Sequence, residues 1–539
     1  MHEVKILDCT LRDGGYYNLW DFDPDVVQAY IEAMAKAKVD YVELGLRELP
    51  QKGFHGAFFY TTEDFINRLR LPNGPSYGVM VNAKSIMGSP KSIGDTVNDL
   101  FVDSKDSHVS IVRVAAHFDE VEKSEAIVKC LKDKGYIVGY NLMQAGGKPS
   151  AELAEKAGIV ASWGQVDVLY FADSLGNMDG GEVKRIISAL RECWSGDLGI
   201  HTHNNMARAL DNCLVAKAAG VKWLDATVTG MGRGAGNSQT ENLLAVISQE
   251  SDSYVTTPVY ELAIRHFEPM QKECGWGSNL LYFLGAQNNL HPTYIQNMLS
   301  DSHFGTDEIV GAIEFLSQQE NRTSYNGDVY KAALTFSGEG KPVSGSPELC
   351  SVAHERDVLI VANGSSLQRY LRDIKAYIRN KKPIVIGINV IEELAEYIDY
   401  YCLSHNNKFL SERGIYNTLK KPVILPKHRF KDSELELFSG SCQLIDYGFE
   451  VKHNCFSVKN EYCVVPFDIT AAYAFSVVET MNPKGVFLAG FDGYESADSR
   501  QLEMLEIFSM MNGLEISKRL IALTPTTYPL VQGSIYAPV

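Results

Sequence analysis

Eight short β-rich segments alternate with helical segments through about 230 residues of the chain, and this repeat constrains the fold more than any other feature. The helical segments are amphipathic, as in residues 23–39 and 205–221. Repeated strand–helix units predict a parallel sheet, and eight of them fit a closed (β/α)8 TIM barrel. A doubly wound open sheet is the alternative, but the count of eight and the polar ends of the segments favour the barrel. The expected strands are Val4–Asp8, Tyr41–Leu44, Tyr77–Asn82, Val109–Ala115, Tyr136–Met143, Val166–Ala172, Leu198–His203 and Trp223–Val228.

The second half of the chain has a different pattern. After about Ser248 it is mainly helical to about Leu334, which predicts a helical extension of the barrel. A Gly-, Ser- and Pro-rich stretch then predicts a linker, and new strand–turn–helix units predict a second α/β domain with an open, Rossmann-like sheet. The expected domains are the barrel at 1–250, the helical extension at 251–336, the linker at 337–350 and the α/β domain at 351–539.

Composition narrows the function classes. The net charge of −17 disfavours binding of nucleic acid or an anionic membrane by the chain as a whole. We expect neither a secretory signal nor a membrane span, since the N-terminal segment has no basic stretch followed by an apolar one and no apolar run is long enough. The 10 cysteines form no CxxC pair, which predicts reduced thiols. We therefore expect a cytoplasmic homo-oligomer with small-molecule substrates.

The ends of the β-rich segments carry the candidate site. Active sites of (β/α)8 barrels lie at the carboxyl ends of the strands. The second segment carries Glu43 and Arg47, the fifth ends near Asn141, and the sixth ends at Asp173 and Ser174. Arg47 and Asn141 are candidate substrate-binding residues.

His201 and His203 end the seventh segment. Residues i and i+2 of a strand point to the same side, and two adjacent imidazoles are natural ligands for one divalent ion. Asp13, which follows the first segment, would complete a His-His-carboxylate set with open positions. The alternative is a pair of polar histidines satisfied by hydrogen bonds, but Asp13 and the glycine-rich loop described below favour the metal site.

Arg12 precedes this carboxylate. An arginine keeps its proton in practice, and beside an open metal position it can stabilise an enolate as negative charge develops. Its alternative role is a structural ion pair with Glu43. The two roles are compatible, because an ion pair with Glu43 would orient the guanidinium in advance.

A glycine-rich loop, GMGRGAGN at residues 230–237, follows the last segment. Its alternating glycines permit tight backbone turns. Such a loop by itself could bind phosphate. Its position is equally suited to bring Asn237 to the metal as a further oxygen ligand.

These motifs together resemble a known superfamily. CTLRDGG, Glu43, HTHNN and GMGRGAGN look like the metal-dependent barrels of 3-hydroxy-3-methylglutaryl-CoA lyase (HMGL-like), 2-isopropylmalate and homocitrate synthases, and 4-hydroxy-2-oxovalerate aldolase. LRDGG and GMGxGAGN lie closest to the aldolase branch, and the resemblance covers about residues 1–300. It implies Arg12 as enolate stabiliser and Ser174 near the carboxylate of a 2-oxo acid. The implied metal ligands are Asp13, His201, His203 and, as a further candidate, Asn237.

One position departs from the aldolase branch. That branch has a histidine shortly after RDG that serves as acid or base, and Tyr16 stands at the matching position here. A tyrosine, with an ordinary pKa of about 10, is a poorer base at neutral pH. Candidates for this task are Tyr16, Tyr17 and, from the helical region, Tyr282. A buried aromatic is the alternative for Tyr282, and His291 and Tyr294 carry the same ambiguity.

The resemblance implies a lyase that makes or breaks a carbon–carbon bond with Mn²⁺, Mg²⁺ or Co²⁺. The ion would act as a Lewis acid on pyruvate, whose enolate adds to an aldehyde or forms on cleavage of a 4-hydroxy-2-oxo acid. One rival is a Claisen-type acyl-CoA synthase or lyase, which GMGRGAGN argues against. Another is a glycosyltransferase with a regulatory barrel, which the complete set of Arg12, Asp13, His201 and His203 argues against.

The second domain carries a weaker resemblance. Asn363, Gly364, Ser365 and Ser366 lie between an apolar strand and a helix, where a helix N-terminus suits phosphate; a plain turn is the alternative. VLIVANGSSL, GIN with Asn389, and VFLAGFDGY resemble bacterial sialyltransferase-like and flagellin-accessory domains, which bind nucleotide sugars, although Ser365 replaces their usual proline. The joint hypothesis is a sugar or sugar-nucleotide aldehyde that the barrel extends or shortens by three carbons, in surface-polysaccharide biosynthesis.

Overall fold

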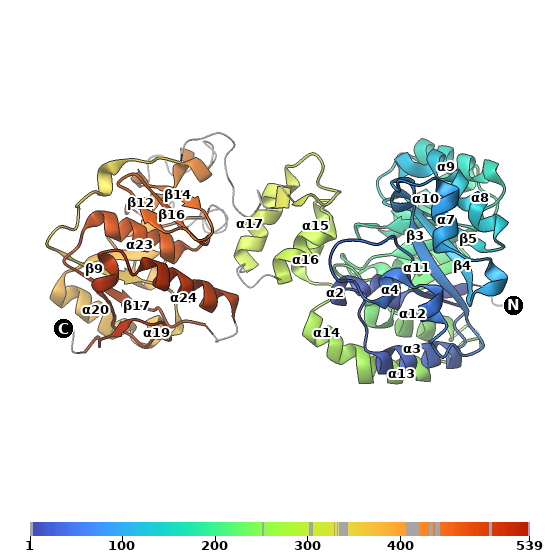
Figure 1. Ribbon diagram of the computed structural model, residues 1–539, viewed down its shortest axis with the longest axis horizontal. Helices are drawn as coiled ribbons and strands as arrows, with labels where there is room; N and C mark the ends of the chain where they lie inside the picture. The colour runs from blue at the N-terminus through green and yellow to red at the C-terminus, as the bar shows by residue number, and fades with distance from the viewer. Residues whose placement is uncertain are drawn as a thin grey trace. The chain divides into compact units, whose positions relative to one another are not determined.

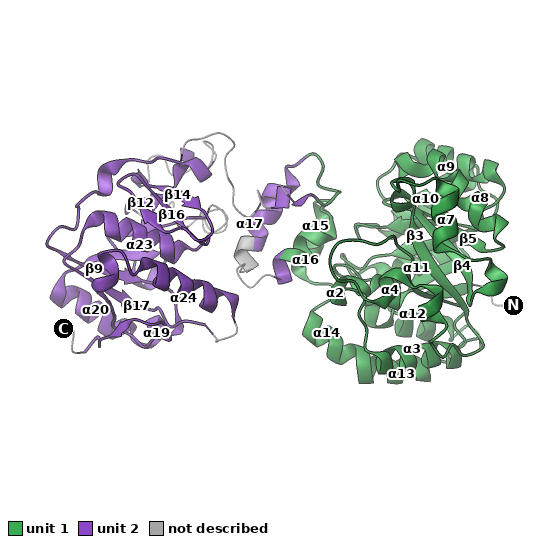
Figure 2. Cartoon of the chain, in the orientation of Figure 1, with its two compact units in different colours: residues 1–297, 320–325 green, residues 298–319, 326–539 purple. Residues whose placement is uncertain are grey.

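The computed structural model describes residues 4–250, 253–300, 306–327, 329–330, 333, 343–405, 415, 420–430, 435–436, 442–494 and 498–536. The chain divides into two compact units, shown in Figures 1 and 2. The barrel unit comprises residues 1–297 and 320–325, and the second unit comprises residues 298–319 and 326–539. The helical region predicted at 251–336 therefore contributes residues to both units.

The barrel unit contains a closed barrel of eight parallel strands in sequence order, with β1 paired to β8. The predicted (β/α)8 barrel is confirmed, and each strand begins and ends within two residues of its predicted bounds. The strands are β1 Lys5–Asp8, β2 Tyr41–Leu46, β3 Ser76–Asn82, β4 Val109–Ala116, β5 Ile137–Leu142, β6 Val168–Asp173, β7 Asp197–Thr202 and β8 Trp223–Ala226.

Helices surround these strands (Figure 1). In α3, Pro24–Lys36, the side chain of Asp23 accepts hydrogen bonds from the first-turn amides, and Pro24 occupies the position where a missing N–H costs nothing. Its buried residues Val27, Tyr30 and Met34 recur at helical spacing, so one face packs on the barrel. The remaining helices of this unit are α1 Thr10–Asp13, α2 Gly15–Asn18, α4 Ala57–Tyr60, α5 Glu63–Ile66, α6 Ala83–Met87, α7 Ile93–Leu100, α8 Glu125–Asp133, α9 Ser150–Trp163, α10 Gly180–Arg191, α11 Ala209–Ala218, α12 Thr240–Ile247, α13 Thr257–Leu262, α14 Glu268–Cys274 and α15 Leu280–Gln287, and α16 Pro292–Ser300 begins in it.

A helical cap, defined here as residues 280–297 and 320–325, contacts the loops at the carboxyl ends of the strands. Gln144, after β5, donates to the carbonyl of Thr323 at 2.9 Å. Asn177, after β6, donates to Asn289 at 2.7 Å. The amide of Gly234, after β8, donates to the cap residue Gln296 at 3.0 Å. The cap therefore lies over the barrel mouth, where the predicted site residues gather.

The second unit contains the predicted open sheet. Its eight strands are all parallel, in the order β13-β12-β11-β10-β9-β17-β18-β19, so the strand order reverses between β9 and β17. A three-stranded sheet, β14-β16-β15, adjoins in sequence. The strands are β9 Asp357–Val361, β10 Ile384–Ile388, β11 Tyr400–Cys402, β12 Val423–Leu425, β13 Leu444–Asp446, β14 Gly448–Val451, β15 Ser457–Val458, β16 Tyr462–Val465, β17 Gly485–Ala489, β18 Leu520–Ala522 and β19 Val531–Gln532, and the helices include α17 Thr306–Ser317, α19 Ser365–Arg369, α20 Leu371–Lys381, α23 Thr470–Met481 and α24 Ser499–Met511.

Among the described residues, the structure contains no helix of the length and apolarity that a bilayer crossing requires.

Candidate metal centre at the barrel mouth

Asp13, His201 and His203 converge at the mouth of the barrel. Asp13 ends α1, His201 lies in β7, and His203 follows β7 in a bridge with Asn237. The Nε2 atoms of His201 and His203 lie 3.9 Å and 3.8 Å from the same oxygen, Oδ2 of Asp13. All three side chains are buried, and their ligand atoms lie within 4.8 Å of one another. This is the predicted cluster.

Each imidazole is oriented by a hydrogen bond at Nδ1, the ring nitrogen that does not face Asp13. Nδ1 of His201 lies 2.9 Å from the carboxylate of Asp225, and Nδ1 of His203 lies 2.9 Å from the backbone carbonyl of Asp173. These partners take the Nδ1 protons and leave both Nε2 lone pairs on the side of Asp13, as metal-ligating histidines require. Nε2 of His203 is buried without a hydrogen-bond partner. The donor set therefore fits a divalent cation.

The protonation of this cluster also suits a cation. Burial alone would raise the pKa of Asp13, but the charge of Arg12, and then the two histidines, lower it well below its usual range. Burial, followed by repulsion from His201, lowers the pKa of His203 to about 3. An ionised carboxylate and a neutral imidazole are the forms that bind metal. Cys9, which forms a second group with His201 and Asp225, is a weaker candidate because burial raises the pKa of its thiol.

The glycine-rich loop brings Asn237 to Asp13. Nδ2 of Asn237 donates to Oδ2 of Asp13 at 2.5 Å, while its Oδ1 is buried without a partner. A Cβ atom added at Gly232 would lie 2.2 Å from Nδ2 of Asn237 and 2.6 Å from Oδ2 of Asp13. Gly230, Gly234 and Gly236 have positive φ angles, so the predicted tight turns are present. Glycine at 232 instead leaves room for the two side chains at the centre.

Arg12 belongs to a buried network of charges. Its Nε donates to Glu43 at 2.7 Å and its Nη1 to Asp13 at 2.6 Å, so the predicted ion pair is confirmed. Glu43 also accepts two hydrogen bonds from Arg113, which in turn donates to Asp225. Burial opposes the charge of Glu43, but Arg113 and Arg12 lower its pKa below the usual value. Nη2 of Arg12 is buried without a partner, and is available as a donor.

Arg113 and Asp225 belong to the charge network of the candidate site, and the motifs did not identify them. Both are fully buried in β4 and β8, and together they connect Glu43 to His201. The available signal was a charged residue inside an apolar run, as in VSIVRVAA and WLDA. Asp173 contributes its backbone carbonyl to the cluster, a role with no side-chain signature.

The candidate substrate-binding residues separate into two groups. Asn141, at the end of β5, is buried with Oδ1 unpartnered, and Oγ of Ser174 accepts the amide of Gln144 at 2.9 Å. Arg47 does not join the metal cluster. Its guanidinium donates to Glu63 at 2.7 Å and lies over the ring of Phe101. The sequence places Arg47 at a strand end, but only the structure shows that this side chain is held among the outer helices.

The tyrosines after RDG differ in environment. Tyr16 is 39% exposed, and its ring contacts Trp20 and lies under Arg233. The hydroxyl of Tyr17 donates to the carbonyl of Gly234 at 2.6 Å and lies 3.2 Å from the hydroxyl of Tyr282. The structure therefore brings Tyr17 and Tyr282 together against the glycine-rich loop.

Tyr282 and His291 project from the cap and are both uncharged. Burial raises the pKa of Tyr282 to about 12. Burial, and then repulsion from Arg233 and His203, lowers the pKa of His291 to about 2. Tyr294 is buried and donates to the carbonyl of Ser324 within the cap, which fits the aromatic-core interpretation.

In the second unit, a carboxylate occupies the turn where phosphate was predicted. Asp492 accepts hydrogen bonds from the hydroxyl of Ser365 at 2.7 Å, from the amide of Ser366 at 2.7 Å and from the Ser366 hydroxyl. A Cβ atom at Gly364 would lie 2.4 Å from the carbonyl of Gly490. The turn is thus closed by the chain itself, and the plain-turn interpretation explains its residues better, because a phosphate would have to displace a carboxylate.

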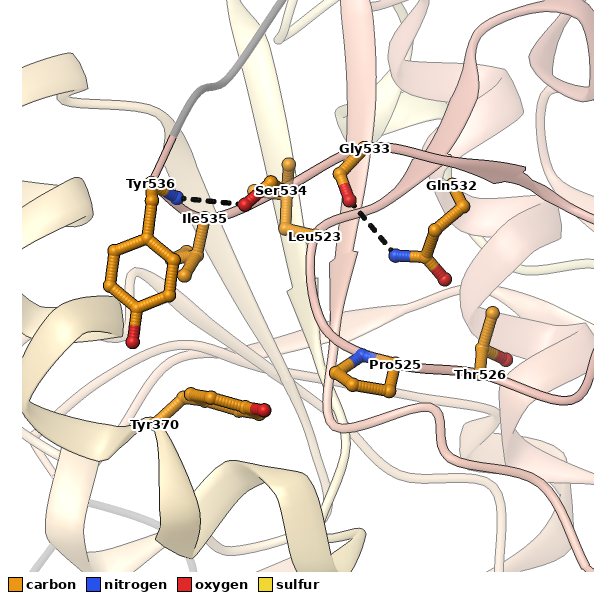
Figure 3. A pocket seen from close by; sticks show the side chains of 9 residues that line it. All are labelled: Tyr370, Leu523, Pro525, Thr526, Gln532, Gly533, Ser534, Ile535 and Tyr536. Atoms are coloured by element: carbon orange, nitrogen blue, oxygen red, sulfur yellow. Dashed lines mark hydrogen bonds between the residues drawn. The ribbon is translucent and has the colours of Figure 1, made fainter.

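The same edge of this sheet carries a cavity of about 360 Å³, shown in Figure 3. The side chains of Tyr370 and Tyr536 form one wall, and Pro525, Thr526 and Gln532 lie opposite. Asn389, at the end of β10, has a positive φ angle and its amide donates to the carbonyl of Cys402. This residue does not line the cavity.

Comparison with known proteins found a matching family, similar sequences and a similar solved structure. Residues 3–267 match the HMGL-like family. The chain is 30% identical over 309 residues to 4-hydroxy-2-oxovalerate aldolase of Pelotomaculum thermopropionicum, covering 57% of this chain and 88% of the relative. It is 32% identical over 250 residues to the enzyme of that name from Carboxydothermus hydrogenoformans, covering 46% and 71%. The N-terminal domain of a candidate aldolase from Bacteroides vulgatus matches 56% of this chain and 98% of that domain, with 31% identity and a TM-score of 0.50.

Proposed function

The chain belongs to the HMGL-like family and is a carbon–carbon lyase, and from this premise we propose that it is a divalent-metal-dependent aldolase that joins pyruvate to an aldehyde or reverses that reaction. The observation that carries the proposal is the buried triangle of Asp13, His201 and His203 beside the free Nη2 of Arg12. A metal site and an adjacent fixed cation together suit a 2-oxo acid, whose enolate carries negative charge.

Asp13, His201 and His203 would hold the ion, with Oδ1 of Asn237 as a further ligand atom. A divalent ion such as Mn²⁺, Mg²⁺ or Co²⁺ supplies Lewis-acid stabilisation of the 2-oxo acid. Arg12 would donate from Nη2 to the developing enolate oxygen. Glu43 and Arg113 would position Arg12, because their hydrogen bonds fix its guanidinium before substrate binds.

The reaction requires two proton transfers. In cleavage of a 4-hydroxy-2-oxo acid, the 4-hydroxyl loses its proton, the C3–C4 bond breaks to release the aldehyde, and its electron pair forms the pyruvate enolate, which takes a proton at C3. In the addition direction, the same steps run in reverse. Tyr282 is protonated at neutral pH, which suits it to donate the proton to the new alkoxide, with Tyr17 at 3.2 Å as its partner.

The experiment that tests this activity is exchange of the methyl protons of pyruvate. We expect the full chain with Mn²⁺ to exchange these protons in D2O, followed by NMR, and to lose exchange on addition of a chelator. If none of the three metals supported exchange, the result would contradict the proposed aldolase activity. Release of free thiol from an acyl-CoA would instead identify the Claisen-type rival.

We also propose that the aldehyde is a sugar or is linked to a nucleotide held by the second unit. The reversal of strand order between β9 and β17 supports this role, since ligands of open parallel sheets bind at such points. The cavity lined by Tyr370 and Tyr536, beside β18 and β19, offers aromatic surfaces for a base. Calorimetry of the full chain with cytidine and uridine diphosphates tests it. We expect binding of one of them, and loss of binding in Tyr370→Ala. Absence of heat with both nucleotides would exclude the nucleotide-linked form.

A further inference from the structure

Arg233, in the glycine-rich loop, carries a positive charge that no carboxylate offsets in the described part of the chain. Arg12 and Arg113, by contrast, both donate hydrogen bonds to carboxylates. Nε of Arg233 is buried without a hydrogen-bond partner. A guanidinium keeps its proton in practice, and a partly buried cation without a counter-ion is costly. Arg233 is therefore a cation that an anionic ligand would stabilise.

The place of Arg233 in the loop is between the candidate metal centre and the helical cap. A Cβ atom at Gly232 would lie 2.6 Å from Oδ2 of Asp13, and a Cβ atom at Gly234 would lie 3.4 Å from Cε1 of Tyr282. One neighbour of Arg233 in the chain thus adjoins a candidate metal ligand, and the other adjoins the proposed proton donor. An anion bound by Arg233 would belong to a molecule in the barrel mouth.

The direction of the side chain agrees with this placement. Cζ of Arg233 lies 5.4 Å from the ring centroid of Tyr16, which is 39% exposed, so the pair lies where the site opens to solvent. The charge of Arg233 is also among the causes that lower the pKa of His203 and of His291. The half-buried guanidinium is therefore close enough to the metal centre and to the cap for its charge to act on both.

The two substrates of the proposed reaction differ in their need for this cation. The charge of pyruvate is met by the metal ion and by Nη2 of Arg12. The carbonyl oxygen of the aldehyde becomes the new alkoxide, which takes its proton from Tyr282. Because Tyr282 adjoins Gly234, the aldehyde would lie on the side of the loop that carries Arg233. An aldehyde that extends towards the opening would bring its far end to the guanidinium.

We propose that Arg233 is a specificity-determining residue that binds a phosphate or carboxylate group on the aldehyde substrate. Both groups are oxyanions that a planar guanidinium binds with two parallel hydrogen bonds. The proposal rests on the proposed aldolase activity for its substrate, but the anion site itself does not depend on catalysis. It predicts that an aldehyde with an anionic group at its far end is preferred to a neutral one.

Two substitutions separate the charge of Arg233 from its shape. Arg233→Gln removes the charge and keeps a polar side chain, and Arg233→Lys keeps the charge without the planar fork. Arg208→Gln is the matched control. Arg208 also follows a barrel strand, β7, but it is exposed and pairs with Asp179 at 3.8 Å.

Steady-state kinetics with Mn²⁺ and pyruvate compare two anionic aldehydes, glyceraldehyde 3-phosphate and succinic semialdehyde, with neutral glyceraldehyde. We expect the unaltered protein to prefer at least one anionic aldehyde. Arg233→Gln should lower kcat/KM for that aldehyde by about tenfold or more, mainly through KM, as for loss of a hydrogen bond to a charged group. Arg233→Lys should lower it less, and glyceraldehyde should be much less affected. The aldehyde that shows the loss identifies the anion as phosphate or carboxylate.

Saturation-transfer NMR measures the anion site without turnover. The probes are glycerol 3-phosphate and 4-hydroxybutyrate, the unreactive alcohols that correspond to the two anionic aldehydes. The full chain is loaded with Mg²⁺ and excess pyruvate, so that the probe does not bind the metal ion instead. We expect a signal from at least one probe with the unaltered protein and with Arg208→Gln, and its loss in Arg233→Gln.

Three outcomes would overturn the proposal. The first is an equal loss of kcat/KM with anionic and neutral aldehydes, and the second is a rise in KM for pyruvate alone. The third is a probe signal that is absent from the unaltered protein with both alcohols or is unchanged in Arg233→Gln. If pyruvate proton exchange fails while probe binding still depends on Arg233, the aldolase assignment is wrong and the anion site stands, so the two failures are distinguishable.

Discussion

His201 and His203 are held by different partners, a side chain in one case and a backbone carbonyl in the other. Neither hydrogen bond requires a metal. Replacing a histidine therefore removes a metal ligand but should leave the barrel folded. We expect His201→Ala and His203→Ala to lose bound metal and proton exchange while keeping their fold, as judged by elemental analysis and circular dichroism. His108→Ala, on the exposed surface, is the control. A double variant that retained stoichiometric Mn²⁺ would place the metal elsewhere.

Arg12 uses two of its three nitrogens on Glu43 and Asp13, and its Nη2 has no hydrogen-bond partner. Lysine keeps the charge but cannot make both contacts from one planar group. We expect Arg12→Lys to lower kcat by about 10²-fold or more, as for loss of a donor to a developing oxyanion, with metal content unchanged. The exposed Arg68→Lys should behave as the unaltered protein. Full turnover in Arg12→Lys would reduce Arg12 to a structural role.

Glu241 provides a pH-dependent term in stability. Burial raises its pKa to about 7, from 4.5 when unfolded. The unfolded chain therefore releases this proton first, and the free energy of unfolding falls as pH rises between these values. Glu241→Gln keeps an acceptor for the amide of Thr229 and removes the charge. We expect the variant to be more stable at pH 8 by about 1–3 kcal/mol, with a much smaller difference at pH 5, in denaturant unfolding. An equal difference at both pH values would show that ionisation of Glu241 is not responsible.

At the scale of elements, the glycine-rich loop is shaped around the metal centre. Gly232 has the closest approach to it, since any Cβ there would meet Asp13 and Asn237. We expect Gly232→Ala to displace these side chains and weaken Mn²⁺ affinity by about tenfold or more, the low end of the range for disturbing the groups that orient metal ligands, measured by isothermal titration. Gly94→Ala, in α7 with no atom near its added Cβ, is the matched control. Unchanged affinity in Gly232→Ala would mean that the loop adjusts freely.

The helical cap is the element that turns an open barrel mouth into an enclosed site. Its contacts reach the loops after β5, β6 and β8, and it supplies Tyr282 and His291. Enclosure strengthens electrostatic interactions at the reacting atoms because it removes water. We therefore expect the cap to be required for catalysis.

At the scale of the whole molecule, we expect the two units to have separate roles. All the residues of the candidate centre and its cap lie in the barrel unit. We expect a chain truncated at residue 341 to bind metal and exchange pyruvate protons, and to lose the reaction with the physiological aldehyde if the second unit contributes binding energy to it. The separately crystallised N-terminal domain from Bacteroides vulgatus supports the independence of such a barrel. Loss of exchange in a folded, metal-loaded truncated chain would show that the second unit supplies a catalytic group.

The sequence by itself determined the barrel and the cluster at its mouth. Strand–helix repeats have local causes, namely hydrophobic periodicity and capping residues such as Asp23. Asp13, His201 and His203 could be predicted because carboxyl ends of parallel strands meet at one edge, so the position along the chain gives the position in space. The Arg12–Glu43 pair followed for the same reason.

Only the tertiary structure decided what each polar side chain contacts. Arg113 and Asp225 lie within strands that read as apolar, and their importance comes from partners that are 70 and 112 residues away from Arg113. Arg47 directly follows β2, the strand that carries Glu43, yet it faces the outer helices and pairs with Glu63. Asp492 fills the turn at Ser365 and Ser366, although it lies more than 120 residues further along the chain. These partners could not be predicted from the sequence, because a buried charge or amide pairs with the nearest compatible group in space, wherever that group lies in the chain.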